Sequence, residues 1–167
     1  MRSRTSTSFM AIAALTMSIG FTTPNTAQAA DKMYTNISGS ELVELMQDWG
    51  YRATLGVDDY DDPLVSSSAS GVNFDVFFYD CNTDDPKRCE SLMLTTVFDF
   101  EEAVPLTVAN DWNLNNRFGR AYIDNEGDPI IELDYEMLGG VTAGNLHQTF
   151  KYWENTVGDF SEKIGWR

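Results

Sequence analysis

The chain has 167 residues and carries 26 acidic against 11 basic side chains, which gives a formal net charge of −15. Hydrophobic residues make up 43% and aromatic residues 13%, enough apolar surface for a packed core and too much for global disorder. The negative charge argues against binding to nucleic acid or to an anionic membrane surface, because both depend on cationic side chains.

The first residues have the layout of a cleavable signal peptide: a basic start, an apolar stretch and a small-residue cleavage motif. Arg2 and Arg4 provide the charge, and residues 9–21 are apolar. At the helical rise these residues cover about 20 Å, short of the roughly 30 Å hydrocarbon core of a bilayer, so a membrane anchor fits less well. We predict a signal peptide at 1–29, cut near Ala29 and Ala30, no later membrane span, and a periplasmic or secreted location.

Residues 30–37 are predicted to be a flexible lead, and the folded domain is predicted to cover 38–164. Ser38 and Glu41 have the spacing of a capping box, which marks the start of a helix. Apolar residues follow at helical spacing, and Gly50 ends the helix. These apolar residues are Leu42, Leu45, Met46 and Trp49.

Four strands are predicted next, at 51–57, 64–70, 72–79 and 90–100. The first two are separated by an acidic turn at 58–63. The strand at 72–79 alternates apolar and mixed residues, which is typical of a strand with one buried face. The serine-rich strand at 64–70 is expected to be exposed on one side.

The second half contains a helix from Pro105 to about Asn116, strands at 120–124 and 129–136 joined by a hairpin turn, and a last helix from near Thr142. The last helix carries an amphipathic stripe of Leu146, Phe150, Trp153 and Val157. The predicted order is α-β-β-β-β-α-β-β-α, without the βαβ alternation of a parallel sheet. We therefore predict an α+β domain with a single antiparallel sheet flanked by helices.

Both cysteines, Cys81 and Cys89, fall in the part predicted to be exported, where an oxidising compartment favours a disulfide. A reactive thiol would need a lowered pKa, and the acids around this pair act in the opposite direction. Two cysteines without a nearby histidine do not make a zinc site. A structural bridge is the preferred interpretation.

Acidic turns at 58–62 and 124–128 raise the question of calcium binding. Neither has the twelve-residue loop with its terminal bidentate glutamate, so solvated turns are favoured. His147 is the only histidine, and the sequence contains no nucleophile motif or phosphate-binding glycine loop. We predict no catalytic residues, no metal and no cofactor.

Residues 110–120 are the most unusual part of so acidic a chain, because they combine asparagine, arginine and aromatic residues. One interpretation is structural, with asparagines capping a helix end and the aromatic residues in the core. The other is a recognition surface, since tryptophan and arginine are common anchors at interfaces. The candidate binding residues are Trp112, Asn113, Arg117, Phe118 and Arg120.

The same region carries a family resemblance. The motifs N-x-W-N at 110–113, R-F-x-R-A-Y at 117–122 and D-x-x-G-D-P at 124–129, with the strand pair at 71–92 and the glycines at 139–140, resemble the YbjN family. Members of this family are described as bacterial sensory transduction regulators, and the resemblance covers roughly residues 37–160. It implies a fold similar to class I type III secretion chaperones, no catalytic residues and, by analogy of fold, a homodimer. The signal peptide sets this chain apart from cytoplasmic members.

The sequence therefore predicts an exported, non-enzymatic YbjN-domain protein that binds a protein or peptide partner. A periplasmic sensor of a small molecule or of calcium is the alternative, and a small hydrolase fits less well.

Overall fold

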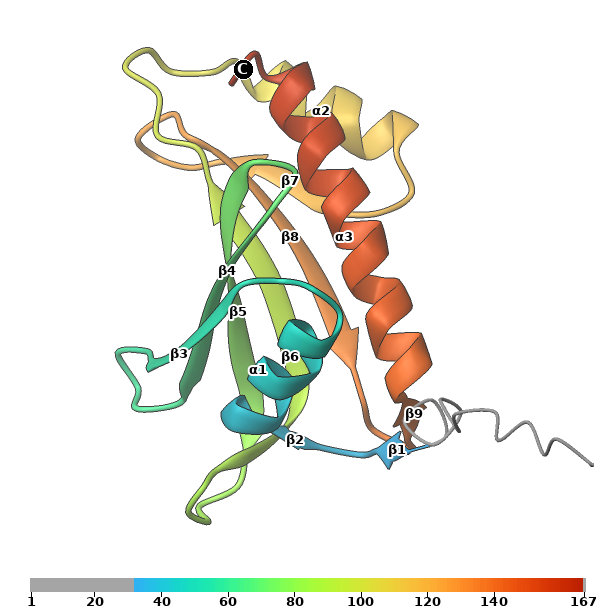
Figure 1. The fold of residues 1–167 in the computed structure, drawn as a ribbon. Coiled ribbons are helices and arrows are strands. Elements are labelled where there is room, and N and C mark those ends of the chain that lie inside the picture. Colours follow the sequence, from blue (N-terminus) through green and yellow to red (C-terminus); the bar gives the residue numbers. More distant parts are fainter. Residues whose placement is uncertain (1–31, 167) are drawn as a thin grey trace, which may run out of the picture.

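The computed structural model describes residues 32–166, so the predicted signal peptide lies outside the described residues. Three helices lie on one side of a seven-stranded sheet, with a separate two-stranded sheet below them (Figure 1). This confirms the predicted α+β class. The elements are β1 (Met33–Tyr34), β2 (Ile37–Ser38), α1 (Gly39–Asp48), β3 (Ala53–Val57), β4 (Pro63–Ala69), β5 (Val72–Cys81), β6 (Arg88–Val97), α2 (Leu106–Asn115), β7 (Arg120–Ile123), β8 (Pro129–Glu136), β9 (Val141–Thr142) and α3 (Ala143–Lys163).

The main sheet has the order β3-β4-β5-β6-β8-β7, and every pair of neighbours is antiparallel. β2 pairs with β6 beside this path, and β1 pairs with β9 in the small sheet. The predicted order of long elements is confirmed, and the two-residue strands β1, β2 and β9 are additional. Within the described range, no helix is long and apolar enough to cross a bilayer.

The core forms between the helices and one face of the sheet. Val72, Phe74, Val76 and Phe78 alternate along β5 and are all buried, as period-two burial requires. The long helix α3 crosses this face, and its predicted stripe from Leu146 to Val157 is fully buried. Burying each such side chain stabilises the fold by roughly 1.5–3 kcal/mol. Packing of this face of the sheet against α3 therefore stabilises the fold.

The ends of α1 agree with the sequence. The backbone N–H of Glu41 donates to Ser38 Oγ at 3.3 Å, and the backbone N–H of Ser38 donates to the Glu41 carboxylate at 3.2 Å, which is the predicted capping box. At the other end Gly50 has a φ of +92°, and Tyr51 N–H donates to Met46 O. Tyr51 thus still belongs to the helix terminus, which explains why β3 begins at Ala53 rather than at residue 51.

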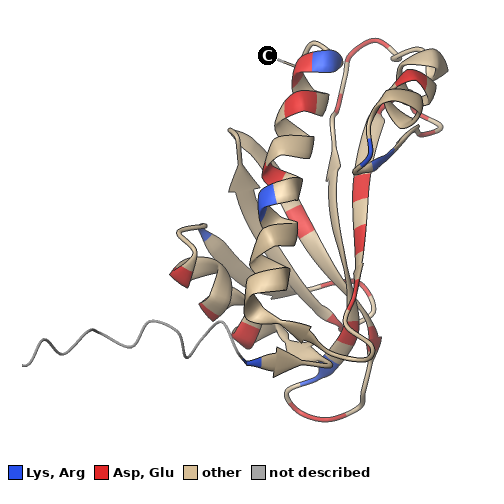
Figure 2. Cartoon of the chain, turned by 90° about the vertical axis from the view of Figure 1, so that its right-hand side faces the viewer, with Lys and Arg blue, Asp and Glu red and all other residues tan. Residues whose placement is uncertain are grey.

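Cys81 and Cys89 are paired across β5 and β6, with an S–S distance of 2.09 Å. The predicted bridge is present and closes residues 82–88 into a loop, called here the disulfide loop. The loop projects from the end of the sheet where α1 and β3 also lie (Figure 1). Acidic residues occur on helices, strands and loops alike, with few basic residues between them (Figure 2).

Candidate binding site

The predicted binding segment at 110–120 joins α2 to β7. Trp112 is only 3% exposed, and its indole N–H donates to the backbone oxygen of Gly119 at 3.0 Å. Its ring meets Phe160 of α3 edge-on, with the ring centres 5.1 Å apart. Trp112 therefore fixes α2 against α3 and the start of β7 from within the core.

The other candidates lie on three different surfaces. Phe118 stacks on Tyr152 of α3 at 4.5 Å, and the Arg117 guanidinium lies 5.1 Å from the Phe118 ring centre. A pocket of about 200 Å³ lies beside these two residues and Trp112. Asn113 and Arg120 do not line it. A role in binding stays a prediction for all five candidate residues.

Arg120 forms an ion pair with Glu132 on the face of the sheet opposite the helices. The Tyr122 hydroxyl donates to the same carboxylate at 2.7 Å, and Glu132 is 6% exposed. Burial, followed by this hydrogen bond, raises the pKa of Tyr122 to about 12. The contacts of Arg120 and Tyr122 with Glu132 join β7 to β8. They also supply partners for the buried carboxylate of Glu132.

Asn113 closes one edge of the sheet. Its side-chain N–H donates to the backbone oxygen of Ala121, and the backbone N–H of Ala121 donates to its side-chain oxygen, both at 2.9 Å. The amide thus satisfies the outward-facing backbone groups in the middle of β7, the last strand of the sheet. A further strand cannot pair there without displacing Asn113.

At the opposite edge, β3 has β4 as its only neighbouring strand among the described residues, so its outer side is open. Gln47 of α1 donates its side-chain N–H to Ala53 O at 3.3 Å, so the backbone groups of Ala53 face outward. Because outward and inward groups alternate along an antiparallel strand, those of Leu55 and Val57 also face outward. Within residues 32–166, no turn, loop or side-chain hydrogen bond reaches the backbone of Leu55 or Val57. β3 therefore offers unpaired donors and acceptors to another strand.

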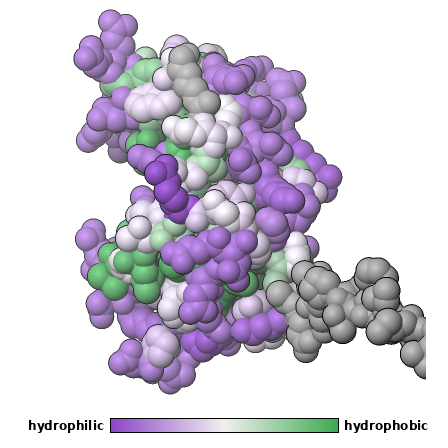
Figure 3. Space-filling model, in the orientation of Figure 1, coloured by the Kyte–Doolittle hydropathy of each residue, from purple (hydrophilic) through white to green (hydrophobic). Residues whose placement is uncertain are grey.

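The side chains of β3 are also exposed on the helix side of the sheet. Leu55 is 48% exposed and Val57 is 64% exposed. Figure 3 shows a hydrophobic patch over β3, with a hollow in the surface above it. An exposed apolar patch and an unpaired sheet edge are both features of surfaces that bind an extended peptide as an added strand.

A groove of about 420 Å³ runs beside β3, between the start of α1 and the disulfide loop. Its apolar part consists of Leu55, Val57, Pro63 and Pro86. Gly39 allows α1 to approach closely, since a Cβ at this position would lie 2.5 Å from Leu55 Cδ1. The end of the half-exposed Leu55 side chain would have to shift to admit a larger residue there.

Carboxylates line the rest of the groove. Asp61, Asp84 and Asp85 contribute to its wall. Lys87 also lies there, but its ammonium donates to Asp62 and to Asp61 O, both at 2.8 Å. The pKa of Lys87 is raised, first by the hydrogen bond to Asp62 and then by the surrounding carboxylates. The groove is therefore acidic, and Lys87, the basic side chain among its described lining residues, is already engaged.

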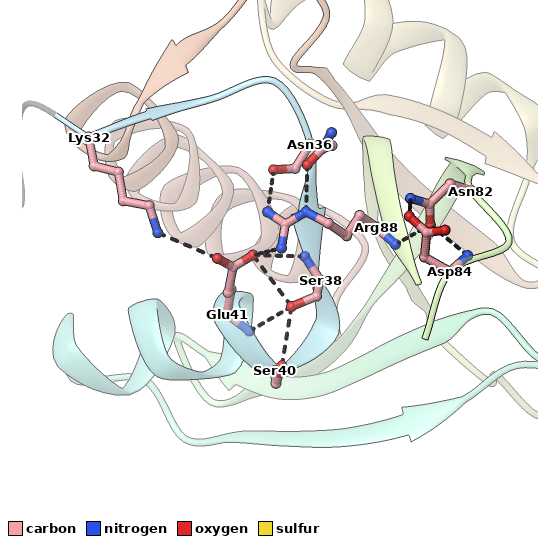
Figure 4. Close-up of polar contacts among 8 residues, drawn as sticks. All are labelled: Lys32, Asn36, Ser38, Ser40, Glu41, Asn82, Asp84 and Arg88. Carbon is pink, nitrogen blue, oxygen red and sulfur yellow. Dashed lines mark hydrogen bonds and ion pairs between the residues drawn. The ribbon is translucent and has the colours of Figure 1, made fainter. Parts of the chain in front are cut away.

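Arg88 ties the two walls of the groove together. Its guanidinium pairs with Glu41 at 2.7 Å and donates to the side chain of Asn36 at 2.7 Å. Its backbone N–H donates to Asn82 Oδ1 at 2.9 Å, inside the disulfide loop. Figure 4 shows these contacts around the capping box of α1. The disulfide loop and the start of α1 are thus joined through one residue.

On the opposite face of the sheet, beside Thr54 of β3, lies a pocket of about 780 Å³. Hydroxyl, amide and carboxylate groups line it, including Thr54, Ser66, Asn73 and Asp75. Two chemically different surfaces therefore flank β3: an acidic and apolar groove on the helix side, and a hydroxyl-rich hollow on the other side.

The acidic turns have structural roles. Asp124 Oδ1 accepts from the backbone N–H groups of Glu126, Gly127 and Asp128 at 2.9–3.0 Å, and Asp58 Oδ1 accepts from Tyr60 and Asp62 at 2.9 Å. No group of three or more histidine, cysteine, aspartate or glutamate side chains in the described part of the chain is placed to hold a metal ion.

The fold and the site define a small α+β domain with one closed and one open sheet edge. Residues 38–166 match the YbjN family model, described as "Putative bacterial sensory transduction regulator", and the chain belongs to this family. No curated protein and no solved structure gives a significant match. The resemblance to class I type III secretion chaperones stays a prediction.

Sequence reasoning did not identify β3 as a site. The signal that was available is the alternation of Leu55 and Val57 with Thr54 and Gly56, directly before an acidic turn. What the sequence does not reveal is that this strand lies at the edge of the sheet, where no other strand of residues 32–166 pairs with its outer side.

Proposed function

We propose that the protein is an exported, non-enzymatic regulator that captures an extended segment of a partner polypeptide on β3. The observation that carries this proposal is the unpaired outer edge of β3, with Leu55 and Val57 exposed beside it. Addition of a strand to a sheet edge is a recurring mode of peptide recognition: backbone hydrogen bonds supply affinity, and alternate side chains supply specificity.

The contrast between the two edges supports this choice. Proteins protect exposed sheet edges because an unpaired edge invites association. Here Asn113 protects β7, whereas β3 has no equivalent side chain over Leu55 and Val57 among the described residues. An edge left open in a chain that closes the other one is consistent with a partner that pairs with it.

Export and the regulatory role have separate support. The signal-peptide layout at 1–29 and the disulfide favour an oxidising compartment. The family description supports a regulator, and Asp58 and Asp124 each accept backbone hydrogen bonds within their own turns.

The test uses a synthetic probe, the peptide Ser-Val-Thr-Lys-Thr-Val-Ser, with its binding measured by fluorescence anisotropy. Val57→Pro removes the outward N–H of Val57, and proline is tolerated on an edge strand whose N–H faces solvent. Val57→Thr keeps the N–H and the branched side chain and is the matched control. We expect Val57→Pro to weaken binding at least about tenfold, and Val57→Thr to bind like the wild type.

Peptides with N-methylated backbones give an independent check. In an antiparallel pair, the residues opposite Leu55 and Val57 bond to β3 and place their side chains in the groove. N-methylation of the valine and lysine residues should then abolish binding, and N-methylation of the threonines should not. The reverse result indicates parallel pairing. If both N-methylated peptides bind like the parent, or if Val57→Pro has no effect, β3 is not the site.

A sensor of a small polar molecule is the second candidate, favoured by the hydroxyl-rich pocket of about 780 Å³. A ligand that binds only the native state raises the melting temperature. A thermal-shift screen with polar metabolites, repeated on Asn73→Ala, tests this function; a shift in the wild type that Asn73→Ala removes would support it.

A further inference from the structure

We propose that the captured segment is basic and that it places a lysine or arginine side chain in the groove beside β3. The aliphatic stem would lie against Leu55, Val57 and Pro86, and the charged end would lie among Asp61, Asp84 and Asp85. This inference rests on the proposed function, since it assumes capture on β3.

The geometry follows from strand pairing. A strand added to β3 would lie about 4.8 Å away, and its side chains would alternate between the two faces of the sheet. Side chains directly opposite Leu55 and Val57 point to the helix side, where the groove lies. Those opposite Thr54 and Gly56 point to the hydroxyl-rich hollow. One face of the segment therefore meets an acidic apolar surface, and the other meets small polar groups.

The excess of acidic side chains at this end of the molecule favours a positively charged ligand. The β3–β4 turn and the disulfide loop contribute Asp58, Asp59, Asp61, Asp62, Asp84 and Asp85. Lys87 pairs with Asp62, and Arg88 is engaged by Glu41 and Asn36. Most of these carboxylates are left without a cation of the described chain, and acidic segments border the loop in Figure 2. An acidic segment would be repelled there, whereas a basic one would be attracted.

The length of a basic side chain also suits the groove. Lysine and arginine lay their methylene stems along apolar surface and keep the charge at the polar end. Leu55, Val57 and Pro63 lie on and next to β3, whereas Pro86 lies on the disulfide loop together with Asp84 and Asp85. A short apolar side chain would contact only the first group, and a basic one would contact both. The expected sequence pattern is therefore basic or apolar residues that alternate with small polar residues.

The experiment compares three probes that differ at one position: the lysine peptide above, the same peptide with N-acetyl-lysine, and the same peptide with glutamate. Acetylation keeps the stem and removes the charge. We expect the wild-type protein to bind the lysine peptide about tenfold more tightly than the acetylated one, and the glutamate peptide most weakly. The preference for lysine should shrink as salt is added.

The protein variant is the double substitution Asp61→Asn and Asp85→Asn. Asp61 has a φ of +64°, a conformation that asparagine also accepts, so the turn is retained. The control is Glu101→Gln with Glu102→Gln, in the exposed loop at the other end of the sheet. The first pair should abolish the preference for lysine and leave binding of the acetylated peptide unchanged. The second pair should leave the preference intact.

The outcomes separate the two proposals. Equal binding of all three peptides, still weakened by Val57→Pro, overturns the basic specificity and retains capture on β3. No binding of any peptide, or binding that Val57→Pro does not affect, overturns capture itself. If light scattering shows a dimer that Val57→Pro converts to a monomer, the occupant of β3 is a second copy of this chain, and the basic partner is excluded.

Discussion

The side-chain amide of Asn113 bonds to both backbone polar groups of Ala121, so a residue of α2 occupies the place of a neighbouring strand at the edge of β7. This relationship gives Asn113 a structural role, although a different one from the helix cap that the structural interpretation of the sequence offered. It also defines the asymmetry of the sheet, because no side chain in the described part of the chain covers Leu55 and Val57 of β3 in a comparable way.

Asn113→Ala should lower the free energy of unfolding by about 1–3 kcal/mol, since two backbone groups of a buried residue lose their partners. Asn115→Ala is the matched control from the same helix, because Asn115 bonds only to Asp111 one turn earlier. Its effect should stay within about 0.5 kcal/mol. Urea denaturation measures both, and equal effects would mean that the bonds to Ala121 contribute nothing.

Trp112 and Arg117 should respond differently to alanine substitution. Trp112→Ala should lower the free energy of unfolding by roughly 3–5 kcal/mol, because it empties a buried site between α2 and α3. Arg117→Ala, at an exposed position, should change stability by less than about 0.5 kcal/mol. If Arg117→Ala also abolishes capture of a partner from periplasmic extract, the predicted role of this segment in recognition is correct.

Replacing both cysteines, Cys81→Ser with Cys89→Ser, should destabilise the fold by roughly 2–3 kcal/mol in the chain-entropy estimate for a short loop. Because the disulfide loop forms one wall of the groove, affinity for the lysine probe should fall as well. Mass spectrometry after alkylation of the unfolded wild type should show no added label until a reductant is present. Labelling without reductant would contradict the bridge.

Asp124 should make stability depend on acid pH. The hydrogen bond from the backbone N–H of Asp128, supported by those from Glu126 and Gly127, holds the pKa of this carboxyl below its usual range. The stabilisation is therefore fully present above the unfolded value of about 3.9 and is lost as pH falls through the lower folded pKa.

The difference in stability between wild type and Asp124→Asn should accordingly be largest near neutral pH and shrink below about pH 4. Glu126→Gln is the control, since the Glu126 side chain forms no hydrogen bond within residues 32–166. A pH-independent difference for Asp124→Asn would show that the carboxylate charge does not matter in this turn.

Local sequence patterns predicted much of the fold, because capping, helical stripes and strand alternation depend on interactions between residues close together in the chain. The capping box of Ser38 and Glu41, the stripe of α3 and the alternation of β5 each follow from a short stretch of chain, and each is confirmed. The disulfide between Cys81 and Cys89 could be predicted because a short turn between two strands is enough to bring the two cysteines together. The family followed from motifs clustered at 110–129, and the match over residues 38–166 confirms it.

The remaining features depend on how distant segments come together. β1 and β9 are two residues each and exist because Met33 and Tyr34 meet Thr142 and Val141. The placement of β8 between β6 and β7 cannot be derived from a hairpin pattern. For the same reason the sequence did not distinguish Asn113, which closes an edge, from Arg117, which lies at the surface.

The contacts of Arg88 have a kinetic consequence. Because one guanidinium holds Glu41 and Asn36 while its own backbone holds Asn82, the groove does not have to close around a ligand. Association with a short extended peptide should then follow a single exponential, without a slow conformational phase. Differences in affinity among peptides should appear in their residence times, and Arg88→Ala should introduce a second, slower step in binding.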